Sequence, residues 1–212
     1  MTPGPPPDCQ LCPRLVAFRA QNRAREPNWH NAPVPPFGPL AARLLIVGLA
    51  PGLRGANRTG RPFTGDHAGK LLYATLLKYR FAAGLHAEHA GDGLLLLDCR
   101  VTNAVRCVPP ENKPTGQEIL ACRPFLQQEL AAMPGLAAVL VLGRIAHDQL
   151  LVTLGLPRRQ YPFGHGERHS LPGGAWLYDS YHCSRYNTQT GRLTPAMFEA
   201  VIQRIRQDLD AG

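Results

Sequence analysis

The sequence is poor in charged residues and contains no long apolar run. Charged side chains make up 18% of the 212 residues, below the roughly 25% usual in soluble proteins. No stretch approaches the ~20 apolar residues of a membrane span. The proline-rich start, Met1–Asp8, also lacks the apolar core of a signal peptide. We therefore expect a cytoplasmic protein without a membrane partner.

Lysine is scarce, and arginine supplies most of the positive charge. Lys and Arg together number 23 against 15 Asp and Glu, which gives a formal net charge of +8. Arginine makes bidentate contacts with phosphate, so this balance favours a polyanionic partner. A general solubility charge in a genome that prefers arginine codons explains the same excess, and composition alone leaves both interpretations open.

One segment, Leu44–Lys70, organises the rest of the chain. A short apolar run, Leu44–Val47, ends in Gly48, a long glycine-rich loop follows, and a helix is expected over Ala68–Tyr79. The loop contains neither the G-x-G-x-x-G pattern nor the Walker lysine of phosphate-binding loops. A loop of this length inside a compact domain is usually functional.

Strands and helices alternate along the whole sequence. The expected strands cover residues 43–47, 94–102, 137–142 and 175–181, and the further expected helices cover residues 15–25, 115–132, 144–154 and 195–209. This order predicts a three-layer α/β/α fold with a central, mostly parallel four-stranded sheet. We expect one domain over residues 1–212 with residues 1–8 as a disordered lead. The loops after the first, second and fourth strands should meet at one edge of the sheet.

Four cysteines occur as two separated pairs. Cys9 and Cys12 form a C-x2-C pair, and Cys107 and Cys122 follow much later. Four thiolates suit a [4Fe–4S] cluster or a structural zinc ion, and the distant second pair favours iron–sulfur. Four unrelated buried cysteines remain the alternative. The other two, Cys99 in a strand and Cys183 in a loop, are expected to serve packing.

Three motifs and the four paired cysteines occur in the order found in a known family. The motifs are G-L-A-P-G…G-A-N-R-T-G-R-P-F-T-G-D (48–66), V-T-N-A-V-R-C-V-P-P-E-N-K-P-T (101–115) and H-C-S-R-Y-N-T-Q-T-G-R-L-T (182–194). Together they resemble the iron–sulfur uracil-DNA glycosylases, most closely the family 5, or UDGb-like, branch. Cys183 departs from the usual His-Pro-Ser. Leu49 replaces a water-activating acid, which is typical of this branch.

The resemblance implies hydrolysis of the bond between a damaged base and deoxyribose after the base leaves the duplex. Phe63 would stack on the base, Asn103 would bind the Watson–Crick edge of uracil, and His182 would donate to uracil O2 as negative charge develops. The backbone at Gly48, Leu49 and Ala50 would approach the base. Taken singly, Phe63 could be a core residue, Asn103 a turn residue and His182 a hydrogen-bonded residue at a strand end.

Asp66 is the acid/base candidate in the central loop, where it could hold the attacking water. It also directly precedes a helix, so an N-cap role is equally compatible with its position.

The resemblance also implies a set of partners. Damaged DNA, single- or double-stranded, would bind a monomer through cations and a wedge beside the base pocket. The cluster would be structural or help to position DNA. The residues expected at the DNA are Arg54, Arg58, Arg61, Lys113, Arg185, Tyr186 and Arg192. A non-catalytic iron–sulfur nucleic-acid-binding protein and a small-molecule hydrolase remain as alternatives.

Overall fold

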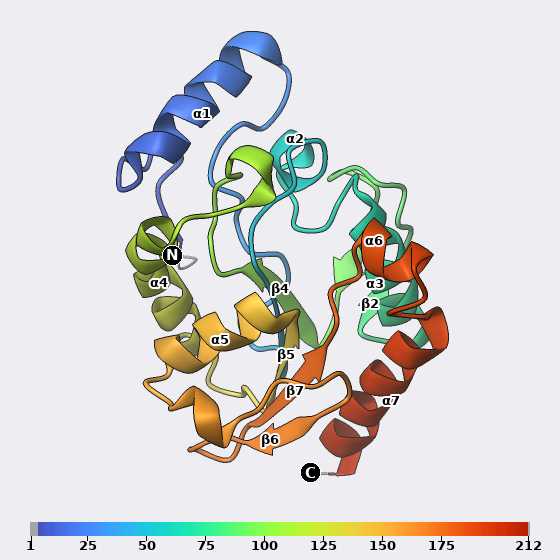
Figure 1. Cartoon of the computed structure of the whole chain (residues 1–212). Coiled ribbons are helices and arrows are strands. Elements are labelled where there is room, and N and C mark those ends of the chain that lie inside the picture. The colour runs from blue at the N-terminus through green and yellow to red at the C-terminus, as the bar shows by residue number, and fades with distance from the viewer. Residues whose placement is uncertain (1–3, 212) are drawn as a thin grey trace.

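A five-stranded sheet forms the centre of the fold (Figure 1). The computed structural model describes residues 4–211. The strands lie in the order β4-β1-β5-β7-β6, and their bounds are β1 Leu44–Gly48, β4 Cys99–Asn103, β5 Ala138–Leu142, β6 Arg168–Ser170 and β7 Trp176–Ser180. All neighbours pair in parallel except β6, which is antiparallel to β7. The predicted α/β class and mostly parallel sheet are confirmed.

Helices cover both faces of this sheet. Their bounds are α1 Pro13–Arg25, α2 Ala56–Thr59, α3 His67–Lys78, α4 Gly116–Ala131, α5 Arg144–Thr153, α6 Arg185–Gln189 and α7 Pro195–Ala211, with short 3-10 turns at Pro110–Asn112 and Arg158–Gln160. Figure 1 shows α4 and α5 on one side of the sheet and α3 and α7 on the other. Within this part of the chain, no helix is long and apolar enough to cross a lipid bilayer.

Strand β1 is apolar throughout because its side chains alternate between two faces of the sheet that are both covered by helices. Leu44 and Ile46 of β1 pack in the core beneath α3 and α7, whereas Leu45 and Val47 pack in the core beneath α4 and α5. Every residue of β1 is buried. A strand covered by helices on both faces has no solvent-facing side, so its sequence shows a continuous apolar run.

The sequence predicts four strands in the sheet, and the structure has a fifth, β6. The segment 161–174 was expected to be loop, yet its polar residues 168–170 pair with β7 at the sheet edge. A three-residue edge strand carries no apolar pattern that could be recognised. The expected strand 94–102 is also divided, because Leu95–Leu96 (β3) pairs with Ala82–Ala83 (β2) in a separate ribbon.

Helix boundaries follow local sequence signals closely. Thr115 accepts a hydrogen bond from the Glu118 main-chain N–H at 3.3 Å, and the Glu118 carboxylate accepts one from the Thr115 N–H at 2.7 Å, so the predicted capping box is confirmed. Residues 1–3 of the expected disordered lead lie outside the described part of the chain. The following residues form a turn in which the Cys9 N–H donates to the Pro6 carbonyl.

Candidate active site

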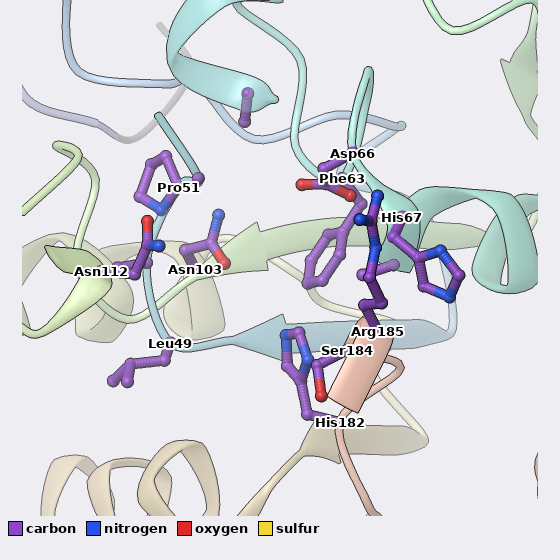
Figure 2. A pocket seen from close by; sticks show the side chains of 14 residues that line it. Leu49, Pro51, Phe63, Asp66, His67, Asn103, Asn112, His182, Ser184 and Arg185 are labelled. Carbon is purple, nitrogen blue, oxygen red and sulfur yellow. The ribbon is translucent and has the colours of Figure 1, made fainter. Parts of the chain in front are cut away.

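A cavity of about 350 Å³ opens at the carboxyl ends of β1, β4 and β7 (Figure 2). The loops that follow these three strands all contribute to its wall, so they converge as the strand order predicted. Its lining residues are Leu49, Ala50, Pro51, Gly52, Ala56, Phe63, Asp66, His67, Ala68, Asn103, Asn112, His182, Ser184 and Arg185. Asn112, His67 and Ser184 were not singled out from the sequence, although each lies in or beside one of the three motifs.

Phe63 is both a core residue and part of the cavity wall. Its side chain is 6% exposed, and its ring centroid lies 5.9 Å from that of His182. Its backbone has a φ of 51°, in the left-handed region that is strained for a bulky residue. Helix α3 holds this turn, since a Cβ at Gly69 would lie 1.7 Å from the Phe63 carbonyl oxygen.

Gly48 allows Phe63 and Asn103 to lie against the end of β1. A Cβ at this position would lie 2.5 Å from Phe63 Cζ and 2.5 Å from Asn103 Oδ1. These distances leave no room for any side chain. The glycine that ends the first strand is therefore required by the close packing of the two residues expected to contact the base.

Asn103 ends β4 directly beside Gly48 in the sheet register. Its side chain is buried, and among residues 4–211 its Oδ1 has no hydrogen-bond partner. A buried carbonyl oxygen without a partner costs free energy and usually marks a site that another molecule completes. The amide is thus available to a ligand in the cavity.

His182 follows β7 and presents its ring to the same cavity (Figure 2). Burial lowers its pKa below the ordinary value, and the nearby Asp66 carboxylate opposes this shift only in part. The imidazole is therefore neutral at pH 7, with one N–H to donate. The Asn187 amide holds the loop by donating to the His182 carbonyl oxygen at 2.9 Å.

Asp66 caps helix α3 and also reaches the cavity. Its Oδ1 accepts a hydrogen bond from the Gly69 N–H at 3.0 Å, so the capping role is present. The carboxylate also lines the cavity, and burial raises its pKa above the ordinary value. A Cβ at Gly55 would lie 2.6 Å from the second oxygen, so this glycine leaves space for it. Capping and contact with a bound molecule are geometrically compatible.

Leu49 and Ala50 form an apolar part of the cavity wall and connect it to the cysteines. Both pack against a small core that contains Val105 and Cys122. The Leu49 carbonyl also accepts a hydrogen bond from the Val105 N–H at 2.9 Å. The apolar wall of the cavity and the cysteine region therefore share one layer of packed residues.

Several cations lie in a groove that adjoins the cavity. Arg54 and Arg185 line an adjoining groove together with Lys70, which was not among the predicted residues. The Arg58 guanidinium lies beside them and donates to the Arg54 carbonyl at 2.8 Å. This arrangement places positive charge next to the opening, as expected for a surface that meets a phosphate backbone.

The remaining predicted contact residues lie at the surface. Tyr186 on α6 is 70% exposed, and the Lys113 ammonium is also exposed, 3.7 Å from the exposed Glu111 carboxylate. Arg192 lies over the Tyr181 ring, 4.8 Å from its centroid, and lines a neighbouring pocket together with His182. All three are accessible to a large partner.

The prediction that Arg61 contacts DNA is wrong. Its side chain is 5% exposed, and its guanidinium forms a bidentate ion pair with the buried Asp92, both N···O distances being 2.7 Å. It also lies over the rings of Phe37 and Tyr73. Arg61 is not accessible to a phosphate because its ion pair with Asp92, which is distant in sequence, holds the guanidinium in the interior.

The two cysteine pairs line one cavity between α1 and α4, although no group of three or more metal-ligating residues close enough to hold a metal ion is found among residues 4–211. The Arg106 main-chain N–H donates to Cys122 Sγ at 3.3 Å, and the Arg19 guanidinium lies 3.6 Å from Cys107 Sγ. Burial raises the pKa of the Cys12 thiol to about 11 and that of Cys107 to about 12. Four thiols in one cavity, two of them with N–H donors at their sulfurs, are a donor set of the kind that an iron–sulfur cluster requires.

The other two cysteines are packing residues, as predicted. Cys99 donates to the Phe81 carbonyl at 3.3 Å inside β4. Cys183 is buried in the main core, and burial raises the pKa of its thiol strongly. The thiol that replaces the usual proline therefore fills space behind His182.

Comparison with known proteins places this site in a family. The model of the uracil DNA glycosylase superfamily matches residues 35–206. This chain belongs to that superfamily. A type-5 uracil-DNA glycosylase of Thermus thermophilus is 48% identical over 208 residues, which cover 94% of this chain and 93% of the relative. A type-5 uracil-DNA glycosylase of Pyrobaculum aerophilum is 38% identical over 205 residues, which cover 95% and 89%.

A relative of another type shows how far the similarity extends across the superfamily. The type-4 uracil-DNA glycosylase of Archaeoglobus fulgidus is 36% identical over 115 residues, which cover 53% of this chain and 49% of the relative. The type-5 relatives match nearly the whole chain, so the predicted family 5 resemblance is confirmed. All three motifs lie inside the region that the superfamily model matches.

Proposed function

We propose that this protein is a monofunctional DNA glycosylase that hydrolyses the N-glycosidic bond of uracil and other deaminated bases in DNA. One observation carries the proposal most strongly: the buried Asn103 oxygen has no hydrogen-bond partner among residues 4–211 and lies beside Phe63 and His182 in one cavity. An amide presents an acceptor and a donor side by side, which match N3–H and O4 of uracil. A base turned out of the duplex would complete this site.

In this proposal one residue stabilises the leaving base and another activates the attacking water. Water oxygen bonds to C1′ of the sugar as the bond from C1′ to the base nitrogen breaks, and the base leaves with the electron pair. The neutral His182 ring donates its N–H to uracil O2, where negative charge develops. Asp66 orients the water and takes its proton, a role that its raised pKa favours. The Leu49 side chain has no polar group that could activate water, so stabilisation of the leaving base makes the larger contribution to catalysis.

The substrate range follows from the same cavity. Leu49 and Ala50 form an apolar wall beside the base, and Asp66 is the only carboxylate among the described lining residues. A wall with few polar groups excludes fewer base shapes, so deaminated purines are included in the proposal. Single- or double-stranded DNA would lie along the groove of Arg54, Lys70 and Arg185, bound by a monomer that acts as a single catalytic unit.

We further propose that Cys9, Cys12, Cys107 and Cys122 hold a [4Fe–4S] cluster. Their shared cavity and the N–H donors at two sulfurs support this assignment. When bound, such a cluster would connect the segment that leads into α1 to Cys107 after β4 and Cys122 on α4, and no step of base release passes through it. Protein purified without oxygen should contain iron and absorb visible light. Cys107→Ser should lose this absorbance, whereas the matched Cys99→Ser, in a strand outside the cavity, should keep it.

The test of activity is base release from duplexes that contain uracil or hypoxanthine. Wild type should release both, and Asp66→Ala should reduce the single-turnover rate by about 10²–10⁴-fold. Glu199→Gln, a carboxylate change on α7 outside the cavity, serves as the control and should keep full activity. Salt-sensitive DNA binding without base release, from protein with its cluster intact, would instead show a non-catalytic nucleic-acid-binding protein.

A further inference from the structure

Arg19 is a buried cation beside the cysteine cavity with no carboxylate partner among residues 4–211. Its side chain is 4% exposed. One terminal nitrogen donates to the Cys9 carbonyl at 2.8 Å, and the other lies 3.6 Å from Cys107 Sγ. Guanidinium groups stay protonated in proteins. A full positive charge is therefore buried on one side of the cavity.

A second excess charge lies close to the cysteines, at Arg106, which directly precedes Cys107 and acts on Cys122. Arg100 and Arg106 share the single carboxylate of Glu129, and all three side chains are at most 2% exposed. Thr102 also donates to this carboxylate, at 2.8 Å. Nε and Nη1 of Arg106 have no partner among the described residues. The triad thus carries one uncompensated positive charge, and its Arg106 main chain donates to Cys122.

Within the described part of the chain, the nearby carboxylate of Glu118 does not cancel this excess. Arg14 and Glu118 at the rim form a neutral pair, with Nε and Oε1 2.7 Å apart. Arg19 and the triad together therefore carry two net positive charges that no carboxylate among residues 4–211 balances. Such charges are costly unless paired. Four thiolates around a [4Fe–4S]²⁺ core carry a total charge of minus two, which balances them.

We propose that Arg19 and the Arg100–Glu129–Arg106 triad are the counter-charges of the cysteine-bound cluster and that they raise its reduction potential. This inference rests on the cofactor proposed above. One added electron makes the cluster more negative, and a buried cation stabilises that state more than the oxidised one. Loss of a cation should therefore lower the potential, and loss of the Glu129 charge should raise it. Because the two changes have opposite signs, packing damage alone cannot mimic both.

The experiment measures the one-electron reduction potential of the cluster-containing protein by spectroelectrochemical titration. Arg19→Met should shift the equilibrium at least tenfold toward the oxidised form, about 59 mV lower for one electron. Arg19→Lys keeps the charge and should stay near wild type. Arg25→Met, an exposed arginine on the same helix, is the matched control and should change the potential little. Glu129→Gln should raise the potential.

A second measurement, of thermal stability with and without the cluster, requires no activity assay and does not use the Glu129 variant. Removal of the cluster should lower the melting temperature of wild type more than that of Arg19→Met, because the empty wild-type cavity retains both unmatched cations. Equal potentials in Arg19→Met and Arg25→Met, or equal melting losses in wild type and Arg19→Met, would overturn the inference. Protein that incorporates no iron overturns it together with the cofactor proposal. Base release is not measured, so failure of the glycosylase proposal would leave these results unchanged.

Discussion

Replacement of Asp92 by asparagine should destabilise the protein strongly, although the two side chains have nearly the same size and shape. Asp92 and Arg61 form two N···O contacts of 2.7 Å, and their side chains are 0% and 5% exposed. The carboxylate also accepts from the N–H groups of Ala87 and Leu94. Arg61 therefore loses its counter-charge in a place where water cannot replace it.

The magnitude follows from the burial of the pair. Loss of one partner of a buried ion pair costs about 3–5 kcal/mol. For a domain of this size, each kcal/mol changes the melting temperature by about 2–4 °C, so a decrease of about 6–20 °C is expected. The Arg61 guanidinium holds the pKa of Asp92 well below its ordinary range. Its stabilising contribution is complete above the unfolded-state pKa and is lost as pH falls through the folded-state value, so pH 7 reports the full effect.

The assay is thermal unfolding at pH 7 followed by circular dichroism. Glu199→Gln removes one charge of the exposed pair with Lys78 and should cost less than about 1 kcal/mol. The double variant Arg61→Met/Asp92→Leu should be more stable than Asp92→Asn because no unpaired charge stays buried. A decrease below 2 °C for Asp92→Asn, or a double variant less stable than the single one, would refute the reasoning.

The same ion pair should also matter for substrate binding. Arg61 donates to Thr64 Oγ1 at 2.8 Å and thereby spans the strained turn at Phe63. If Phe63 stacks on the base, then a loosened turn in Asp92→Asn should raise KM for uracil-containing DNA at temperatures where the variant is fully folded. An unchanged KM would show that the turn keeps its geometry without the ion pair.

Three further outcomes are expected. Gly48→Ala places a Cβ 2.5 Å from Phe63 Cζ and Asn103 Oδ1, so it should reduce single-turnover base release at least tenfold while the visible absorbance of the protein is retained. Because burial lowers the pKa of His182, base release should not decline between about pH 6.5 and pH 8.5; a tenfold decline per pH unit would show that the protonated ring is required. Tyr186→Ala should weaken release from duplex DNA more than from single-stranded DNA, since a wedge acts only on stacked base pairs, and equal losses on both would contradict that role.

The sequence alone was sufficient for the main features of the fold and the place of the site. The apolar run that ends in Gly48 and the strand expected up to Thr102, next to Asn103, have carboxyl ends that face one edge of the sheet. Thr115 with Glu118 marks the start of a helix. These signals are local: they depend on residue type, spacing of apolar side chains and backbone preferences within a few positions. Local signals also suffice to place Phe63 and Asp66 in the central loop.

Only the tertiary structure decided which charged and polar groups are free to act. The sequence around Arg61 predicts a surface cation, but its ion pair with Asp92, 31 residues away in sequence, buries it. Asp66 proved to be a cap that still reaches the cavity, and Arg19 lies against Cys107 across 88 residues of chain. Burial and pairing depend on contacts between distant segments, and these leave no periodic trace in the sequence. The fold therefore follows largely from local sequence signals. The electrostatics of the base pocket and the cysteine cavity depend on which distant segments pack together in the tertiary structure.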